Sequence, residues 1–97
     1  MLTYVILVNW TQDGILNVKD SPTRLEAVKK AFKAVGGELK SFYLTTGRYD
    51  MVVLAEAPDA ESAAKVALLV GASGAVRTET LRAFTEDEYR KIIAGLP

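Results

Sequence analysis

Two runs of the chain carry apolar side chains at every position, without the polar alternation of a half-exposed strand. They are Val5–Val8 and Met51–Ala55. Successive strand residues point to opposite faces of a sheet, so such runs indicate strands that are covered on both faces. Two further segments contain more polar residues and suit outer positions. The pattern therefore predicts four strands, at residues 3–10, 38–46, 48–57 and 76–84.

Between the first two predicted strands, apolar residues recur with the spacing of a helix. We expect a helix from Ser21 to Val35, in which Ser21 caps the start and Pro22 occupies the first turn. Gly36 suits its end, because glycine readily adopts the left-handed cap conformation. A short helical turn is expected before it, at Ile15–Lys19.

Two more helices are predicted in the second half of the chain. An alanine-rich helix is expected from its cap, Asp59, to about Val70. Its small side chains would either bring it close to the sheet or leave space beside it. A C-terminal helix follows Thr85, which forms a capping box with Glu88.

The order of these elements is β-α-β-β-α-β with a terminal helix, which is the ferredoxin-like pattern of a single α+β domain over residues 1–97. In that pattern the first and third strands are central in a four-stranded antiparallel sheet, as their apolar runs require. Two helices cover one face of the sheet. The other face needs a cover, and we expect a second subunit to supply it, sheet against sheet. The alternative is a monomer with a moderately apolar exposed sheet.

The hairpin between the second and third strands is expected to reverse at Gly47. In the third strand Arg48 and Asp50 would then share one face and Tyr49 the other. Alternation in the second strand places Leu39, Ser41, Tyr43 and Thr45 on one face and Lys40, Phe42 and Leu44 on the other.

Composition narrows the chemistry available to the 97-residue chain. It has no cysteine and no histidine, so disulfides and the commonest general base, metal ligand and haem ligand are missing. Twelve basic residues balance twelve acidic ones, which leaves no positive field for nucleic acid or anionic lipid. No secretory or membrane-spanning segment is visible, so the expectation is a cytoplasmic protein without nucleic-acid or membrane partners.

Several segments together resemble the GYD-domain family, whose name comes from a Gly-(x)-Tyr-Asp element. Here that element is Gly47, Tyr49 and Asp50, with Arg48 inserted, and the resemblance covers essentially the whole chain. It implies a place among the dimeric α/β-barrel proteins, whose subunits pair by their sheets. Fold alone does not fix a reaction. The segments that carry the resemblance to the GYD-domain family are residues 8–11, 17–22, 42–50, 56–59 and 76–84.

The turn residues Arg48 and Asp50 are the first candidate site. An arginine there could bind a small carboxylate or polar ligand by a bidentate contact. In the alternative interpretation, which we favour, Asp50 accepts hydrogen bonds from backbone amides and fixes the turn.

A second candidate site combines polar and aromatic residues at the end of the first strand and around the hairpin. An asparagine in an apolar strand needs a hydrogen-bond partner, from the protein or from a ligand. Cofactor-free oxygenases of the dimeric α/β-barrel group use asparagine, tryptophan and tyrosine around an aromatic substrate. The matching residue types are Asn9, Trp10, Tyr43 and Tyr49. For Trp10 we favour packing in a core or interface.

Charged residues on the fourth strand form the third candidate, as an interface or a pocket floor. Arg77, Glu79 and Arg82 alternate with threonines, and a solvated or intersubunit salt-bridge ladder is the favoured interpretation. The acidic residues Asp50, Glu56 and Glu79 lack the spacing of a cation site. No metal and no cofactor are expected, since phosphate-binding, nucleophile and zinc motifs are missing.

These observations leave three hypotheses for function. The first is a non-catalytic small-molecule-binding or interaction module that acts as a homodimer or larger homo-oligomer. The alternative is a cofactor-independent, monooxygenase-like enzyme for a small aromatic or quinol-like substrate. The third is that the assembly itself is the function.

Overall fold

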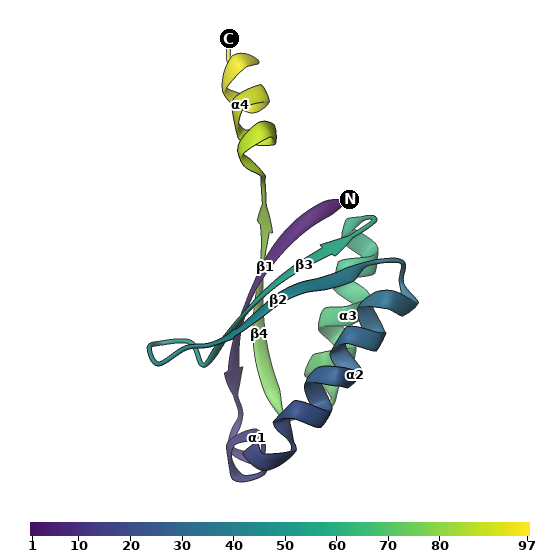
Figure 1. The fold of residues 1–97 in the computed structure, drawn as a ribbon, viewed down its shortest axis with the longest axis vertical. Coiled ribbons are helices and arrows are strands. Elements are labelled where there is room, and N and C mark those ends of the chain that lie inside the picture. Colours follow the sequence, from purple (N-terminus) through teal and green to yellow (C-terminus); the bar gives the residue numbers. More distant parts are fainter.

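The computed structural model describes residues 1–97 as one four-stranded antiparallel sheet with helices on one face (Figure 1). The strand order is β2-β3-β1-β4, so the first and third strands are central, as predicted. The elements are β1 (Leu2–Trp10), α1 (Gln12–Leu16), η1 (Val18–Asp20), α2 (Ser21–Ala34), β2 (Glu38–Leu44), β3 (Met51–Ala57), α3 (Ala60–Ala72), β4 (Val76–Ala83) and α4 (Glu86–Ala94).

The hydrophobic core lies between the inner face of the sheet and helices α2 and α3. On β3, alternate residues from Met51 to Ala57 are buried, and their β1 partners include Tyr4 and Val8. Phe32 of α2 is the largest fully buried side chain. Its burial confirms the apolar stripe expected for this helix, because the stripe is what faces the sheet.

Most of the predicted helix boundaries are confirmed by their caps. Asp59 accepts a hydrogen bond from the backbone nitrogen of Ser62 at 2.7 Å, and this bond lowers the pKa of its carboxyl. The capping box of Thr85 and Glu88 is present, and the backbone hydrogen bond from Thr85 likewise lowers the pKa of Glu88. Gly36 has the expected positive φ of 81°.

The predicted start of α2 is wrong in detail. Ser21 does not cap the helix, because a 3₁₀ turn runs directly into it and Ser21 is already helical. The expected turn at Ile15–Lys19 is two elements, α1 and η1. Residues 12–14, for which the sequence pattern predicts no element, form the first turn of α1 with Thr11 as its cap.

The hairpin also differs from the predicted one. β2 ends at Leu44 and β3 begins at Met51, so residues 45–50 form a loop rather than strand ends around Gly47. The loop is held by the Thr45 hydroxyl, which donates to the carbonyl oxygen of Tyr49 at 2.5 Å. Arg48, Tyr49 and Asp50 are therefore not arranged by strand alternation.

A register shift in β2 changes the faces expected there. Leu39 pairs with Ala55, whereas Ser41 pairs with Leu54, which leaves Lys40 as the extra residue of a bulge. Leu39 and Phe42 consequently both pack against the core, although strict alternation places them on opposite faces. Tyr43 remains on the outer face, opposite Val52.

The C-terminal helix α4 projects away from the sheet instead of covering it (Figure 1). The molecule is accordingly elongated, with extents of 51 × 30 × 18 Å. Its radius of gyration is 14.5 Å, against about 13 Å for a compact domain of this size. No helix in the structure combines the length and the hydropathy that a membrane span needs.

Candidate functional site

The end of β1 and the loop before β3 are joined by two reciprocal hydrogen bonds. The Asn9 side-chain oxygen accepts from the backbone nitrogen of Asp50 at 2.9 Å. The Asp50 carboxylate in turn accepts from the backbone nitrogen of Trp10 at 3.0 Å. A protein group therefore satisfies the side-chain oxygen of the asparagine in this apolar strand. We call these three residues the strand-end clamp.

Beyond the strand-end clamp, the loop reaches over β1 to the other outer strand. The Tyr49 hydroxyl donates to the Glu79 carboxylate of β4 at 2.8 Å, and the pair is exposed. Arg48 lies over the Tyr49 ring at 5.4 Å and makes no ion pair with Asp50. Hydrogen bonding to Tyr49 is the main cause of the raised pKa of Arg48. The two turn residues that were candidates for one ligand site thus have different partners, the Tyr49 ring for Arg48 and the Trp10 amide for Asp50.

The asparagine and the three aromatic residues of the second candidate do not surround a common space. Trp10 lies on the inner side and packs against the core, where its indole nitrogen is buried without a partner. Tyr43 is on the outer face of β2 and is 56 % exposed. Asn9 is hydrogen-bonded within the strand-end clamp, and the Tyr49 hydroxyl is hydrogen-bonded to Glu79.

The charged residues of β4 divide between two places. Arg77 and Glu79 lie on the outer face, opposite Asn9 and Leu7 of β1. Arg82 instead donates to the carbonyl oxygen of Thr3 at 3.2 Å, where β4 leads into α4. No group of three carboxylates is placed to hold a metal ion.

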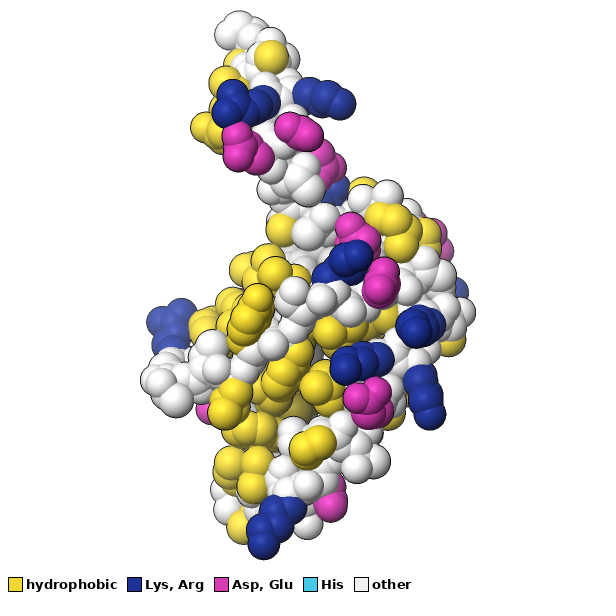
Figure 2. Space-filling view, viewed as in Figure 1, with side chains coloured by type: hydrophobic (Ala, Val, Ile, Leu, Met, Phe, Trp, Pro, Cys, Tyr) yellow, Lys and Arg dark blue, Asp and Glu magenta, His cyan; other side chains and the backbone are white.

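The outer face of the sheet is apolar and has no helix over it. Its centre consists of β1 and β3 residues that lie opposite one another, Val5 with Leu54 and Leu7 with Val52. Leu81 of β4 extends this area and is 44 % exposed. We call Val5, Leu7, Val52, Leu54 and Leu81 the outer apolar face. Figure 2 views the molecule along the edge of the sheet and shows hydrophobic side chains gathered between the sheet and the helices, with many charged ones over the helices.

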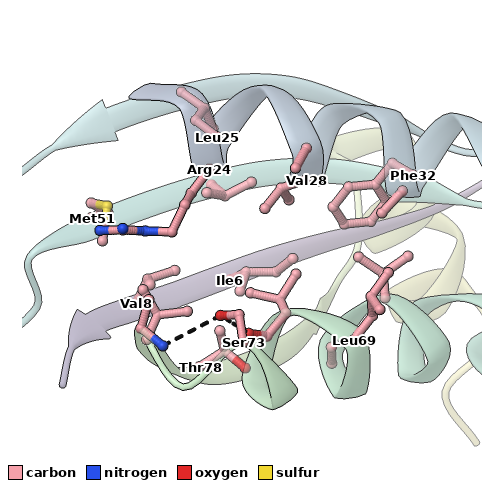
Figure 3. Close-up of a pocket in the computed structure, with 18 of the residues that line it drawn as sticks. Ile6, Val8, Arg24, Leu25, Val28, Phe32, Met51, Leu69, Ser73 and Thr78 are labelled. Carbon is pink, nitrogen blue, oxygen red and sulfur yellow. Dashed lines mark hydrogen bonds between the residues drawn. The ribbon is translucent and has the colours of Figure 1, made fainter. Parts of the chain in front are cut away.

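A cavity of about 360 Å³ lies on the opposite, inner side of the sheet, between α2 and α3 (Figure 3). Aliphatic side chains and Phe32 form most of its wall. Reasoning from sequence identified no residue of this cavity as a site. The available signal was the small residues of the two helices, because Ala27, Ala31 and Ala67 line the space that larger residues would fill.

Known proteins resemble this chain over most of its length. One is the "Glutamine synthetase and cystathionine beta-lyase binding protein" of Thermus thermophilus, which is 32% identical over 84 residues. The match covers 86% of this chain and 88% of that protein. The crystal structure of TTHA0845, also from Thermus thermophilus, is 29% identical with a TM-score of 0.54, and the match covers 88% of this chain and 95% of that one.

A more distant likeness concerns the fold alone. The feast or famine regulatory protein from M. tuberculosis, solved in complex with L-methionine, is 20% identical and has a TM-score of 0.63. The match covers 90% of this chain but 54% of that one, so the present chain corresponds to about half of the regulator.

The family model for the GYD domain matches residues 4–93, from the first central strand into α4. This range includes the strand-end clamp and nearly all of the sheet. The resemblance seen in the sequence is thereby confirmed, and the chain belongs to the GYD-domain family.

Proposed function

We propose that this chain is a non-catalytic interaction module that acts as a homodimer and binds a partner protein. The observation that carries the proposal is the outer apolar face, which no element of the chain covers. Exposed apolar areas of this kind mark interaction surfaces in folded proteins. The same face on a second copy is the simplest cover, because a two-fold axis pairs one surface with itself.

Charge supports self-association as well. The chain has no net charge, so two copies approach without long-range repulsion. Arg77 and Glu79 stand on the same side of the sheet as the outer apolar face and have opposite signs. In a two-fold pair they can face their counterparts at the rim of the interface.

The partner protein is inferred from the relative named for binding glutamine synthetase and cystathionine beta-lyase. An interaction role also agrees with the hydrogen bonds of the candidate residues Asn9 and Asp50, because these bonds fix the loop to β1. The alternative of a cofactor-independent enzyme has less support. Its four proposed residues, Asn9, Trp10, Tyr43 and Tyr49, do not line the one large apolar cavity.

Leu54→Glu tests the dimer. A carboxylate at the centre of the outer apolar face would have to be buried without a partner, so the variant should be monomeric at concentrations at which the parent protein is dimeric. Sedimentation equilibrium measures this, with circular dichroism as the check on folding. Leu68→Glu is the matched control, since Leu68 is on α3 and is 74% exposed. A parent protein that is still monomeric at a concentration of about 10⁻⁴ M contradicts the proposal.

Binding of the two enzymes is tested separately with purified proteins. Glutamine synthetase and cystathionine beta-lyase from the organism that carries this chain are titrated with it in biolayer interferometry. Saturable binding of either enzyme supports the partner class. If neither binds, the partner assignment fails, while the dimer is judged by its own experiment.

A further inference from the structure

The inner cavity is partly open to solvent, since Leu69 in its wall is 63% exposed. This space of about 360 Å³ falls within the range of small-molecule sites. It is bounded by the inner faces of the strands and by α2 and α3, whose alanines leave it unfilled (Figure 3).

One end of the cavity holds a cation without an acidic partner. Arg24 of α2 lines the cavity, and Figure 3 shows its guanidinium at the end of the cavity away from Phe32. Its Nη2 donates to the carbonyl oxygens of Asn17 at 3.1 Å and Gly14 at 3.4 Å. No carboxylate forms an ion pair with it.

This arrangement defines the chemistry of a ligand. A guanidinium has five N–H donors, and the two carbonyl oxygens share the Nη2 group of Arg24. The three remaining N–H groups, on Nε and Nη1, can donate charge-assisted hydrogen bonds to an oxygen of a carboxylate or a phosphate. Ser73 offers no competing site, since its hydroxyl donates to the Val70 carbonyl oxygen at 2.7 Å and accepts from Ala75.

We infer that the cavity binds an amphipathic monocarboxylate. The carboxylate pairs with Arg24, and the apolar tail lies between α2 and α3 toward Phe32 and Leu69 (Figure 3). A single arginine neutralises a single negative charge, so a dianionic phosphate monoester would keep an uncompensated charge beside an apolar wall. The inference concerns the inner side of the sheet and does not depend on the proposed dimer.

The probes are decanoate, decanol, decyl phosphate and decyltrimethylammonium, which share one tail and differ in the headgroup. Isothermal titration calorimetry of the full chain, below the micelle concentration of each probe, should give tightest binding for decanoate. Decanoate affinity should fall at least about tenfold in Arg24→Gln, because a charge-assisted hydrogen bond is lost. Decanol affinity should stay within about twofold, since decanol makes no ion pair.

Two further variants make the result specific. Lys33→Gln removes a positive charge from an exposed position on the same helix, outside the cavity, and should leave decanoate affinity unchanged. Ala67→Leu adds volume to the wall and should weaken both decanoate and decanol. If Ala67→Leu fails to fold, Ala31→Leu makes the same test from α2.

Methyl NMR spectra locate the bound probe. Decanoate should shift the methyl signals of Val66 and Leu69, which line the cavity, more than those of Leu7 and Leu54 on the outer apolar face. The inference is overturned if decanoate does not bind, if Arg24→Gln binds it as the parent does, or if the largest shifts are on the outer apolar face. Tighter binding of decyl phosphate would overturn the choice of a carboxylate.

Discussion

The Gly-Arg-Tyr-Asp loop owes its shape to hydrogen bonds that cross between segments about forty residues apart. The Asn9 side-chain oxygen accepts a hydrogen bond from the Asp50 amide, which an apolar side chain could not do. The Asp50 carboxylate accepts one from the Trp10 amide at the end of the same strand. Both bonds are partly buried. Loss of the Asp50 carboxylate would leave the Trp10 amide with reduced access to water, whereas the Asp50 amide also donates to the Val8 carbonyl oxygen at 2.9 Å. These residues therefore secure the loop to a central strand.

Asp50→Ala should lower the free energy of unfolding by about 1–3 kcal/mol, because the Trp10 amide loses its charged acceptor. Urea denaturation at one fixed protein concentration measures the change. Tyr49→Phe is the matched control in the same loop. It removes an exposed hydrogen bond and should cost less than about 1 kcal/mol. Equal stability of Asp50→Ala and the parent protein would show that the clamp does not hold the loop.

At the scale of elements, the short helix α1 is fixed by its close approach to the segment before β4. The Thr11 backbone nitrogen donates to the Ala75 carbonyl oxygen at 3.0 Å, and the Thr11 hydroxyl donates to that of Gly74 at 2.5 Å. Gly14 is buried against the same segment, and a β-carbon there would overlap the Ala75 carbonyl oxygen. The absence of a side chain at Gly14 thus permits α1 to lie against the segment before β4.

Gly14→Ala should destabilise the protein by about 1–3 kcal/mol, since the added methyl group forces the backbone of one element to move. Gly71→Ala makes the same chemical change in α3, where nothing lies near the new atom. It should stabilise the protein by about 0.5–1 kcal/mol through helix propensity. Thermal denaturation of both variants distinguishes the effects, and a shift of the same sign in both would contradict the packing explanation.

At the scale of the whole molecule, α4 is an arm that projects from the end of β4 without packing on the sheet. Its apolar residues recur with helical spacing but remain exposed on the isolated chain. Because neither α4 nor the outer apolar face is covered within one chain, we expect a second copy to cover both. The exposed apolar residues are Tyr89, Ile92 and Ile93 of α4 and Leu96 just after it.

Removal of residues 86–97 should weaken the proposed homodimer at least about tenfold, because burial of several apolar side chains contributes well over about 1.4 kcal/mol. Sedimentation velocity across a dilution series gives the dissociation constant. The quadruple change of Glu86, Asp87, Arg90 and Lys91 to glutamine is the control, since it keeps the apolar side of α4 and alters only exposed charges. An unchanged constant after truncation would place α4 outside the dimer interface.

Much of the fold was predictable because it rests on local patterns. The double-sided apolar runs indicated the central strands, and the caps at Asp59 and Thr85 indicated two helix starts. The bulge at Lys40 was not predictable from alternation, since a register shift depends on what the neighbouring strand offers. Nor was the loop at 45–50, because the Asp50 carboxylate and amide take partners from β1, which is remote in sequence.

The sequence by itself determined the element order, the central strands and the surplus of apolar surface, because each follows from the spacing of side chains along a single segment. Tertiary structure decided which polar residues meet. It gave Arg48 and Asp50 different partners, joined Asp50 to Asn9, and placed Arg24 at the end of a cavity. Contacts between these side chains depend on the distances between segments that are remote in sequence. Those distances are set only when helices and strands pack.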